Sequence, residues 1–168
     1  MRDTIARQSD VDENSIKYEI EPGKKSYANG TITFSAQKGK SIDLRKLHES
    51  LTKTRLSGKT RSAVNFLEIT ATGEVVAGGK GTLLKVSGST QFILVDDSKA
   101  KPKEGTKTPY QRLKAALAKG TTVTQVTGRV QGWSGRWPDV LRELAEKDKP
   151  DQAGKKPPVL MVTDFQTE

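Results

Sequence analysis

The chain has 168 residues, and 29 lysines and arginines against 20 aspartates and glutamates give it a formal net charge of +9. It contains no cysteine, which excludes disulfides, thiolate catalysis and thiolate-ligated zinc, copper or iron–sulfur sites. No apolar run approaches the roughly 18 to 20 residues that a membrane-spanning helix needs. The length suits one large or two small domains with a buried core.

The N-terminal part of the sequence predicts a tail, two strands and a helix. Residues 1–14 are polar and mixed in charge, which is typical of a disordered tail. Apolar and polar residues then alternate over 16–20 and over 31–36, and this period of two predicts strands. A helix over 43–57 should follow, because leucines recur at helical spacing and a glycine stands at its end. These residues are Leu44, Leu47, Leu51 and Gly58, with Ser41 or Asp43 as the cap.

The strand–loop–helix–strand order between Gly30 and Thr72 resembles the opening of a heavy-metal-associated domain, which has a ferredoxin-like fold of order βαββαβ. That family binds metal through a CxxC motif in the loop that enters its first helix. The corresponding loop here, 36–41, reads Ala-Gln-Lys-Gly-Lys-Ser and has no cysteine. The resemblance therefore implies a ferredoxin-like unit over 15–64 without the metal chemistry of the family.

Residues 65–168 predict a second unit that begins with three strands. Apolar and polar residues alternate over 67–76, and within this run Gly73 marks a bulge or a bend. Strands over 82–86 and 91–95 are joined by a short polar connection of the kind found in hairpins.

The clearest helix in the sequence is predicted over 109–119. Thr108 is a plausible N-cap, and Pro109 occupies the first helical position, where its missing N–H costs nothing. Gly120 is placed to end the helix. Strands over 123–130 and 159–165 then complete the unit.

We therefore predict an α+β protein in which the ferredoxin-like unit is followed by a five-stranded OB-like β-barrel with a long loop at 131–158. The alternative is a single enlarged ferredoxin-like domain, with the helices at 43–57 and 109–119 on one sheet face. The barrel is favoured because it gives the strand at 159–165 a place in the sheet. Its expected core residues are Leu67, Ile69, Val86, Phe92, Leu94, Leu113, Leu117, Val130 and Leu160.

Catalytic motifs are nearly absent, and we predict that the protein is not an enzyme and has no cofactor. His48, the only histidine, lies on an amphipathic helix and is expected to be a partly exposed surface residue. Asp96 and Asp97 are oxygen donors for a hard cation, but an ordinary polar strand end is favoured, so no metal site is predicted. The segments 58–60 and 78–82 have glycine and lysine in an order similar to phosphate-binding loops. Neither is followed by a helix, so they are not predicted to bind phosphate.

The positive charge is gathered in clusters, which attract polyanions, and lysines in loops suit phosphate contacts that carry no sequence information. The connection at 131–158 holds both tryptophans, and in OB folds it commonly flanks the ligand face. Stacking aromatics with lysine and arginine are typical of a groove for single-stranded nucleic acid, although Trp137 is also placed to fix a short helix to the barrel. The candidate ligand-binding residues are Trp133, Arg136, Trp137, Lys101, Lys103, Arg129, Lys155 and Lys156.

The sequence thus predicts a non-enzymatic protein that binds single-stranded nucleic acid or another polyanion without sequence specificity. The alternative is a cysteine-free relative of metal-handling modules, acting as an exported adaptor or structural domain with a protein partner and no bound metal. The sequence does not determine the compartment: as it stands it predicts a cytoplasmic protein, and an exported one if a signal peptide has been removed. No oligomeric state follows from the residues.

Overall fold

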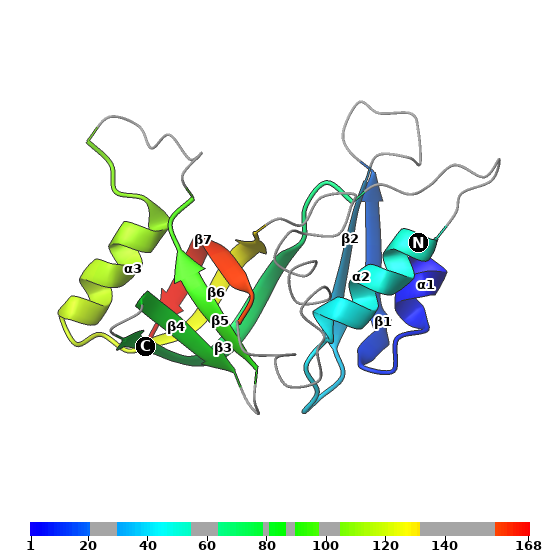
Figure 1. The fold of residues 1–168 in the computed structure, drawn as a ribbon, viewed down its shortest axis with the longest axis horizontal. Helices are drawn as coiled ribbons and strands as arrows, with labels where there is room; N and C mark the ends of the chain where they lie inside the picture. Colours follow the sequence, from blue (N-terminus) through cyan, green and yellow to red (C-terminus); the bar gives the residue numbers. More distant parts are fainter. Residues whose placement is uncertain (21–29, 55–63, 79–80, 87–89, 98–104, 132–156) are drawn as a thin grey trace, which may run out of the picture. The chain divides into compact units, whose positions relative to one another are not determined.

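In the computed structural model the chain divides into two compact units, Met1–Ala63 and Val64–Glu168, so the second begins one residue before the predicted start at Asn65. The structure describes residues 1–20, 30–54, 64–78, 81–86, 90–97, 105–131 and 157–168. These residues form three helices and seven strands, an α+β set (Figure 1). None of the helices in the described ranges is long and apolar enough to span a membrane.

The first unit is a two-stranded antiparallel sheet with two helices. Its elements are α1 (Arg2–Ala6), β1 (Val11–Ile20), β2 (Gly30–Ala36) and α2 (Leu44–Lys53). The register runs from Val11 opposite Ala36 to Ile20 opposite Gly30, with a shift between Asp12 and Lys17. Side chains from both helices and from β1 form a small core, namely Ile5, Val11, Ile16, Leu47 and Leu51.

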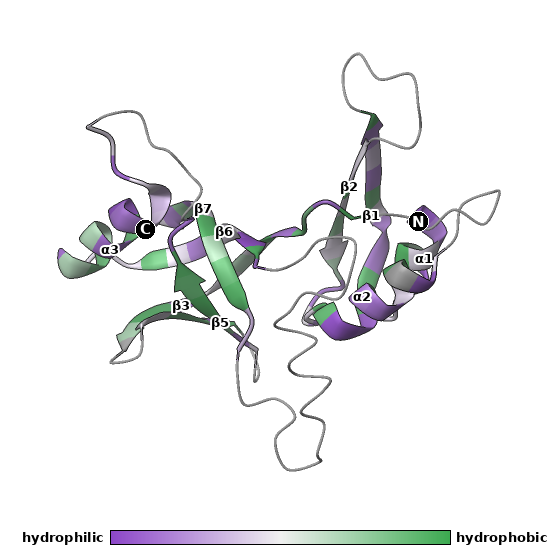
Figure 2. Ribbon diagram, turned by 45° about the horizontal axis from the view of Figure 1, so that its top comes forward, coloured by the Kyte–Doolittle hydropathy of each residue, from purple (hydrophilic) through white to green (hydrophobic). Residues whose placement is uncertain are grey.

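Helix α2 begins where the sequence predicted, because Asp43 caps it. The Asp43 carboxylate accepts hydrogen bonds from the backbone N–H groups of Arg45 and Lys46, which have no partner inside the helix. The helix ends at Lys53, earlier than expected, and the remaining predicted residues, 55–57, lie outside the described part of the chain. Figure 2 shows hydrophilic residues over most of α2 and a narrower hydrophobic stretch.

The prediction of a disordered tail at 1–14 is wrong. Ile5 and Val11 are each only 2% exposed, and α1 contacts both β1 and α2. Polar contacts add to this packing: the Thr4 and Thr54 hydroxyls lie 2.8 Å apart, and the Gln8 side-chain amide donates to Ser50 Oγ at 3.1 Å. The polar composition of residues 1–14 does not indicate that Ile5 of α1 and Val11 of β1 are buried.

The ferredoxin-like arrangement is also not found. Within the described residues β2 pairs with β1, whereas β3 (Glu68–Gly78) pairs with β4 (Gly81–Val86) and β6 (Val123–Val130) in a separate sheet. The resemblance over Gly30–Thr72 therefore does not extend to strand pairing, and the single enlarged ferredoxin-like domain is excluded. An alternating pattern identifies a strand with one buried face, but it does not identify the neighbour of that strand.

In the second unit five strands form a closed ring. The elements after β4 are β5 (Gln91–Val95), α3 (Pro109–Ala118), β6 and β7 (Val159–Thr167). The order around the ring is β3-β4-β5-β7-β6, and β6 pairs back to β3. All neighbours are antiparallel except β5 and β7, which are parallel (Figure 1).

The predicted helix over 109–119 is confirmed together with its local chemistry. Thr108 Oγ1 accepts from the Gln111 backbone N–H at 3.2 Å, and the Gln111 side chain accepts from the Thr108 backbone N–H at 3.3 Å. This reciprocal capping box starts the helix, with Pro109 at its first position. Gly120 follows the helix with φ of +77°, a left-handed conformation that glycine adopts without strain.

The core of the ring is made by residues from all the strands except β3, together with α3. The fully or nearly fully buried side chains are Leu84, Phe92, Leu94, Leu113, Val123, Val126, Val130, Leu160 and Val162. Of the predicted core, Phe92, Leu94, Leu113, Val130 and Leu160 are buried, whereas Leu67, Ile69, Val86 and Leu117 are half-buried. The predicted core residues are thus all at least half-buried. The buried residues that were not predicted are mainly on β6 and β7, namely Val123, Val126 and Val162.

Strand β3 continues through Gly73, as predicted, and changes partner there. Residues Glu68–Thr72 pair with β6, and Gly73–Gly78 pair with β4. A Cβ atom at position 73 would collide with the carbonyl oxygen of Lys85 in the neighbouring strand. A glycine is therefore required at the point where β3 passes from one neighbour to the other.

Replacement of Gly73 by alanine should lower the free energy of unfolding by about 1–3 kcal/mol, because the added methyl group must displace backbone. Urea denaturation followed by circular dichroism measures the change. The adjacent substitution Thr72→Ala is the control, since Thr72 is exposed and its loss should change stability by less than about 0.5 kcal/mol. Equal stabilities of the two variants would contradict the close approach at Gly73.

Candidate functional site

Most of the predicted ligand-binding residues lie outside the described part of the chain. These are Lys101, Lys103, Trp133, Arg136, Trp137, Lys155 and Lys156. Arg129 is described, and it lies on β6 with 47% of its side chain exposed. The candidate site is therefore built around Arg129 and the outer face of the ring.

The guanidinium of Arg129 forms an ion pair with a carboxylate on the neighbouring strand. Arg129 Nε donates to Glu68 Oε2 at 3.4 Å, and the two residues are register partners on β6 and β3. The same Glu68 oxygen accepts from the Thr163 hydroxyl on β7 at 3.3 Å. Three neighbouring strands thus hold the ion pair in place.

An aromatic ring lies against the same guanidinium. Arg129 Cζ is 4.5 Å from the centroid of the Phe66 ring, within the range of a cation–π contact. Phe66 lies two residues before the start of β3 and is 45% exposed, one of the most exposed large apolar side chains in the described residues. We call Phe66, Glu68, Arg129 and Thr163 the Arg129 cluster.

Phe66, Glu68 and Thr163 are not among the ligand-binding residues predicted from the sequence. One local signal was present, since Phe66 and Leu67 are consecutive apolar residues and only one of them can face the core of a strand. The partnership of Glu68 with Arg129 joins residues 61 positions apart and follows only from the strand register.

The outer face of the ring also carries a row of apolar side chains. Val76, Leu83, Ile93 and Val159 are register partners across β3, β4, β5 and β7. They are half-buried, whereas Leu84, Leu94 and Leu160, the next residues along their strands, are fully buried, so the row faces outward. We call these residues the outer apolar row.

A polar row borders the outer apolar row. Glu74, Lys85 and Gln91 are register partners on β3, β4 and β5, and all are exposed. Lys85 therefore places a cation beside apolar surface on a rigid strand. Apolar surface beside an exposed cation can contact a ligand that has both apolar and anionic groups.

His48 is not the surface residue that the sequence predicted. It is only 3% exposed and lies between the buried Leu47 and the half-buried Glu49 on α2. The buried face of an amphipathic helix is wider than a single row of side chains, so His48 is buried beside Leu47 and Leu51. His48 is therefore part of the interior of the first unit.

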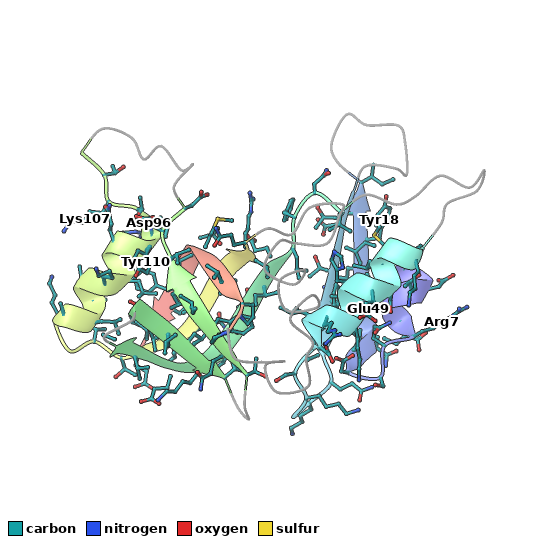
Figure 3. All side chains as sticks on the ribbon, viewed as in Figure 1. Arg7, Tyr18, Glu49, Asp96, Lys107 and Tyr110 are labelled. Carbon is teal, nitrogen blue, oxygen red and sulfur yellow. The ribbon has the colours of Figure 1, made fainter. Side chains whose placement is uncertain are left out.

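Asp96 and Asp97 follow β5 and are half-buried. Asp96, Lys107 and Tyr110 lie at the same end of the second unit, where α3 begins (Figure 3). The Tyr110 hydroxyl is 3.3 Å from that of Thr82, which ties α3 to β4. Within the described ranges there is no group of three or more His, Cys, Asp or Glu side chains that could hold a metal, and the absence of a metal site stays a prediction.

Comparison with known proteins gives no match to this chain, whether among protein-family models, curated proteins or solved structures.

Proposed function

We propose that the second unit is an OB-type barrel that binds single-stranded nucleic acid without sequence specificity. The observation that supports this proposal most directly is the strand order β3-β4-β5-β7-β6, with α3 between β5 and β6 in the sequence. A five-stranded closed Greek-key sheet is the architecture of OB folds, which bind oligonucleotides over their second and third strands. In this protein those strands are β4 and β5.

The outer face of β4 and β5 has side chains that suit such a ligand. Leu83 and Ile93 present half-buried aliphatic surface, and Lys85 lies beside them with its charge exposed. Apolar surface is compatible with any base, and a lysine contacts phosphate as a point charge. The arrangement therefore favours contacts that do not depend on sequence.

The net charge supports the same class of ligand. The chain carries +9, and positive clusters raise the local concentration of a polyanion and accelerate its association. Each neutralised phosphate releases counterion, and this release supplies most of the affinity in non-specific binding. The loop lysines and tryptophans predicted from the sequence would add to this contact.

The proposal is tested by titrating a fluorescein-labelled oligothymidylate with the full-length protein at about 50 mM salt and measuring anisotropy. We expect saturable binding at micromolar protein concentration, and comparable affinity for a mixed-sequence strand of equal length. A lack of binding at tens of micromolar protein would refute the proposed function.

The outer face can be tested separately with Ile93→Glu. A carboxylate in the outer apolar row should repel phosphates and remove apolar contact, so affinity should fall about tenfold or more. Thr122→Glu is the matched control, because Thr122 is an exposed residue in the connection between α3 and β6, away from β4 and β5. Equal losses in the two variants would show that the ligand does not lie over β4 and β5.

A further inference from the structure

We infer that Arg129 contacts nucleic acid by stacking on one base and does not act as a phosphate contact; this inference rests on the proposed function. The guanidinium lies over the Phe66 ring at 4.5 Å, so one of its faces is covered. The Arg129 side chain is 47% exposed, so a large part of it is still accessible to a ligand. Guanidinium planes are stacking surfaces for unpaired bases in single strands.

The charge of Arg129 already has a partner. The Glu68 carboxylate lies 3.4 Å from Arg129 Nε and is itself held by the Thr163 hydroxyl. A phosphate that approaches the guanidinium would also approach this carboxylate, and the two anions repel each other. The pair has no net charge, which makes it a weak source of attraction for a polyanion but leaves the planar face available.

The residues of the Arg129 cluster are also brought together before any ligand arrives. Arg129 and Glu68 are register partners, and the Val130 N–H donates to the Leu67 carbonyl at 2.9 Å, next to Phe66. A base stacked on Arg129 would complete three layers, with the guanidinium between the ring and the base. Because the ion pair with Glu68 and the contact with the Phe66 ring already restrict the Arg129 side chain, less conformational entropy is lost on binding.

The test compares two labelled ligands, an oligothymidylate and an abasic strand of the same length, which has the phosphates but no bases. Arg129→Lys keeps the positive charge and removes the plane. We expect it to weaken oligothymidylate binding roughly 5- to 100-fold, with an unchanged salt slope and unchanged affinity for the abasic strand. Phe66→Leu, which removes the ring that supports the guanidinium, should likewise weaken oligothymidylate binding and leave the affinity for the abasic strand unchanged.

Two further variants separate stacking from charge. Lys85→Gln should lower the affinity for both strands by the same factor. It should also reduce the slope of log affinity against log salt concentration by about 0.7, as expected for the loss of one phosphate contact on a single strand. Glu68→Gln leaves the Arg129 charge without its carboxylate, so it should tighten binding of the abasic strand and increase the slope by about the same amount.

The outcomes distinguish this inference from the proposed function. If the wild-type protein binds oligothymidylate but Arg129→Lys and Phe66→Leu bind it equally well, the stacking inference is overturned and the proposed function stands. If Arg129→Lys lowered the affinity for both strands equally and also reduced the salt slope, Arg129 would be identified as a phosphate contact. That result would also overturn the inference. If the wild-type protein binds no strand, the proposed function fails and the inference with it.

Discussion

The affinity of the full-length protein for a single strand is expected to fall roughly 50-fold when salt is raised from about 50 to about 200 mM, if about four phosphates are neutralised. The slope follows from counterion release, which contributes about 0.7 per phosphate on single-stranded nucleic acid. Anisotropy titrations at four or five salt concentrations would measure it, with log affinity falling linearly against log salt concentration.

A lysine pair provides the control for this prediction. Replacement of Lys101 and Lys103 together by glutamine should reduce the slope by about 1.4 and weaken binding to all sequences alike. These residues lie outside the described part of the chain, so the expectation depends only on their charge in the sequence. A wild-type affinity independent of salt would contradict a polyanion-binding role for the lysine clusters.

The sequence predicted the second unit well where the determining chemistry is local. The capping residue Thr108, the first-turn Pro109 and the terminating Gly120 act on their immediate neighbours, and the structure shows each in its expected role. Strand β6 likewise lies over the predicted residues 123–130. The order of these elements suggested the ring because few architectures accommodate five strands interrupted by one helix.

Prediction failed where long-range pairing decides the outcome. Alternation in Thr31–Ala36 and in Leu67–Val76 correctly indicated strands, but placing them together in one sheet required knowledge of their partners. The role of Ile5 in the first core depends on packing against other elements, so the composition of residues 1–14 did not reveal it. The Arg129 cluster was missed for the same reason, because its members come from three strands and from the segment before β3.

The packing of α3 on the ring yields the largest expected change in stability. Leu113 is fully buried, and α3 contacts β6 and β7, which supply the buried Val126, Leu160 and Val162. Leu113→Ala leaves a cavity that rigid strands cannot fill, so the free energy of unfolding should fall by about 2–5 kcal/mol. For a unit of this size the midpoint temperature of its thermal transition should drop by roughly 10–20 °C.

Leu117→Ala is the matched control, because it removes the same atoms from the same helix at a half-buried position. Its effect should be clearly smaller, since part of the Leu117 side chain already contacts water. Thermal denaturation followed by far-ultraviolet circular dichroism compares the two variants. If the two losses were equal, α3 would not be packed through Leu113. If only the Leu113 variant also lost oligonucleotide binding at temperatures where wild type is folded, the closed ring would be shown to be the structure that binds the strand.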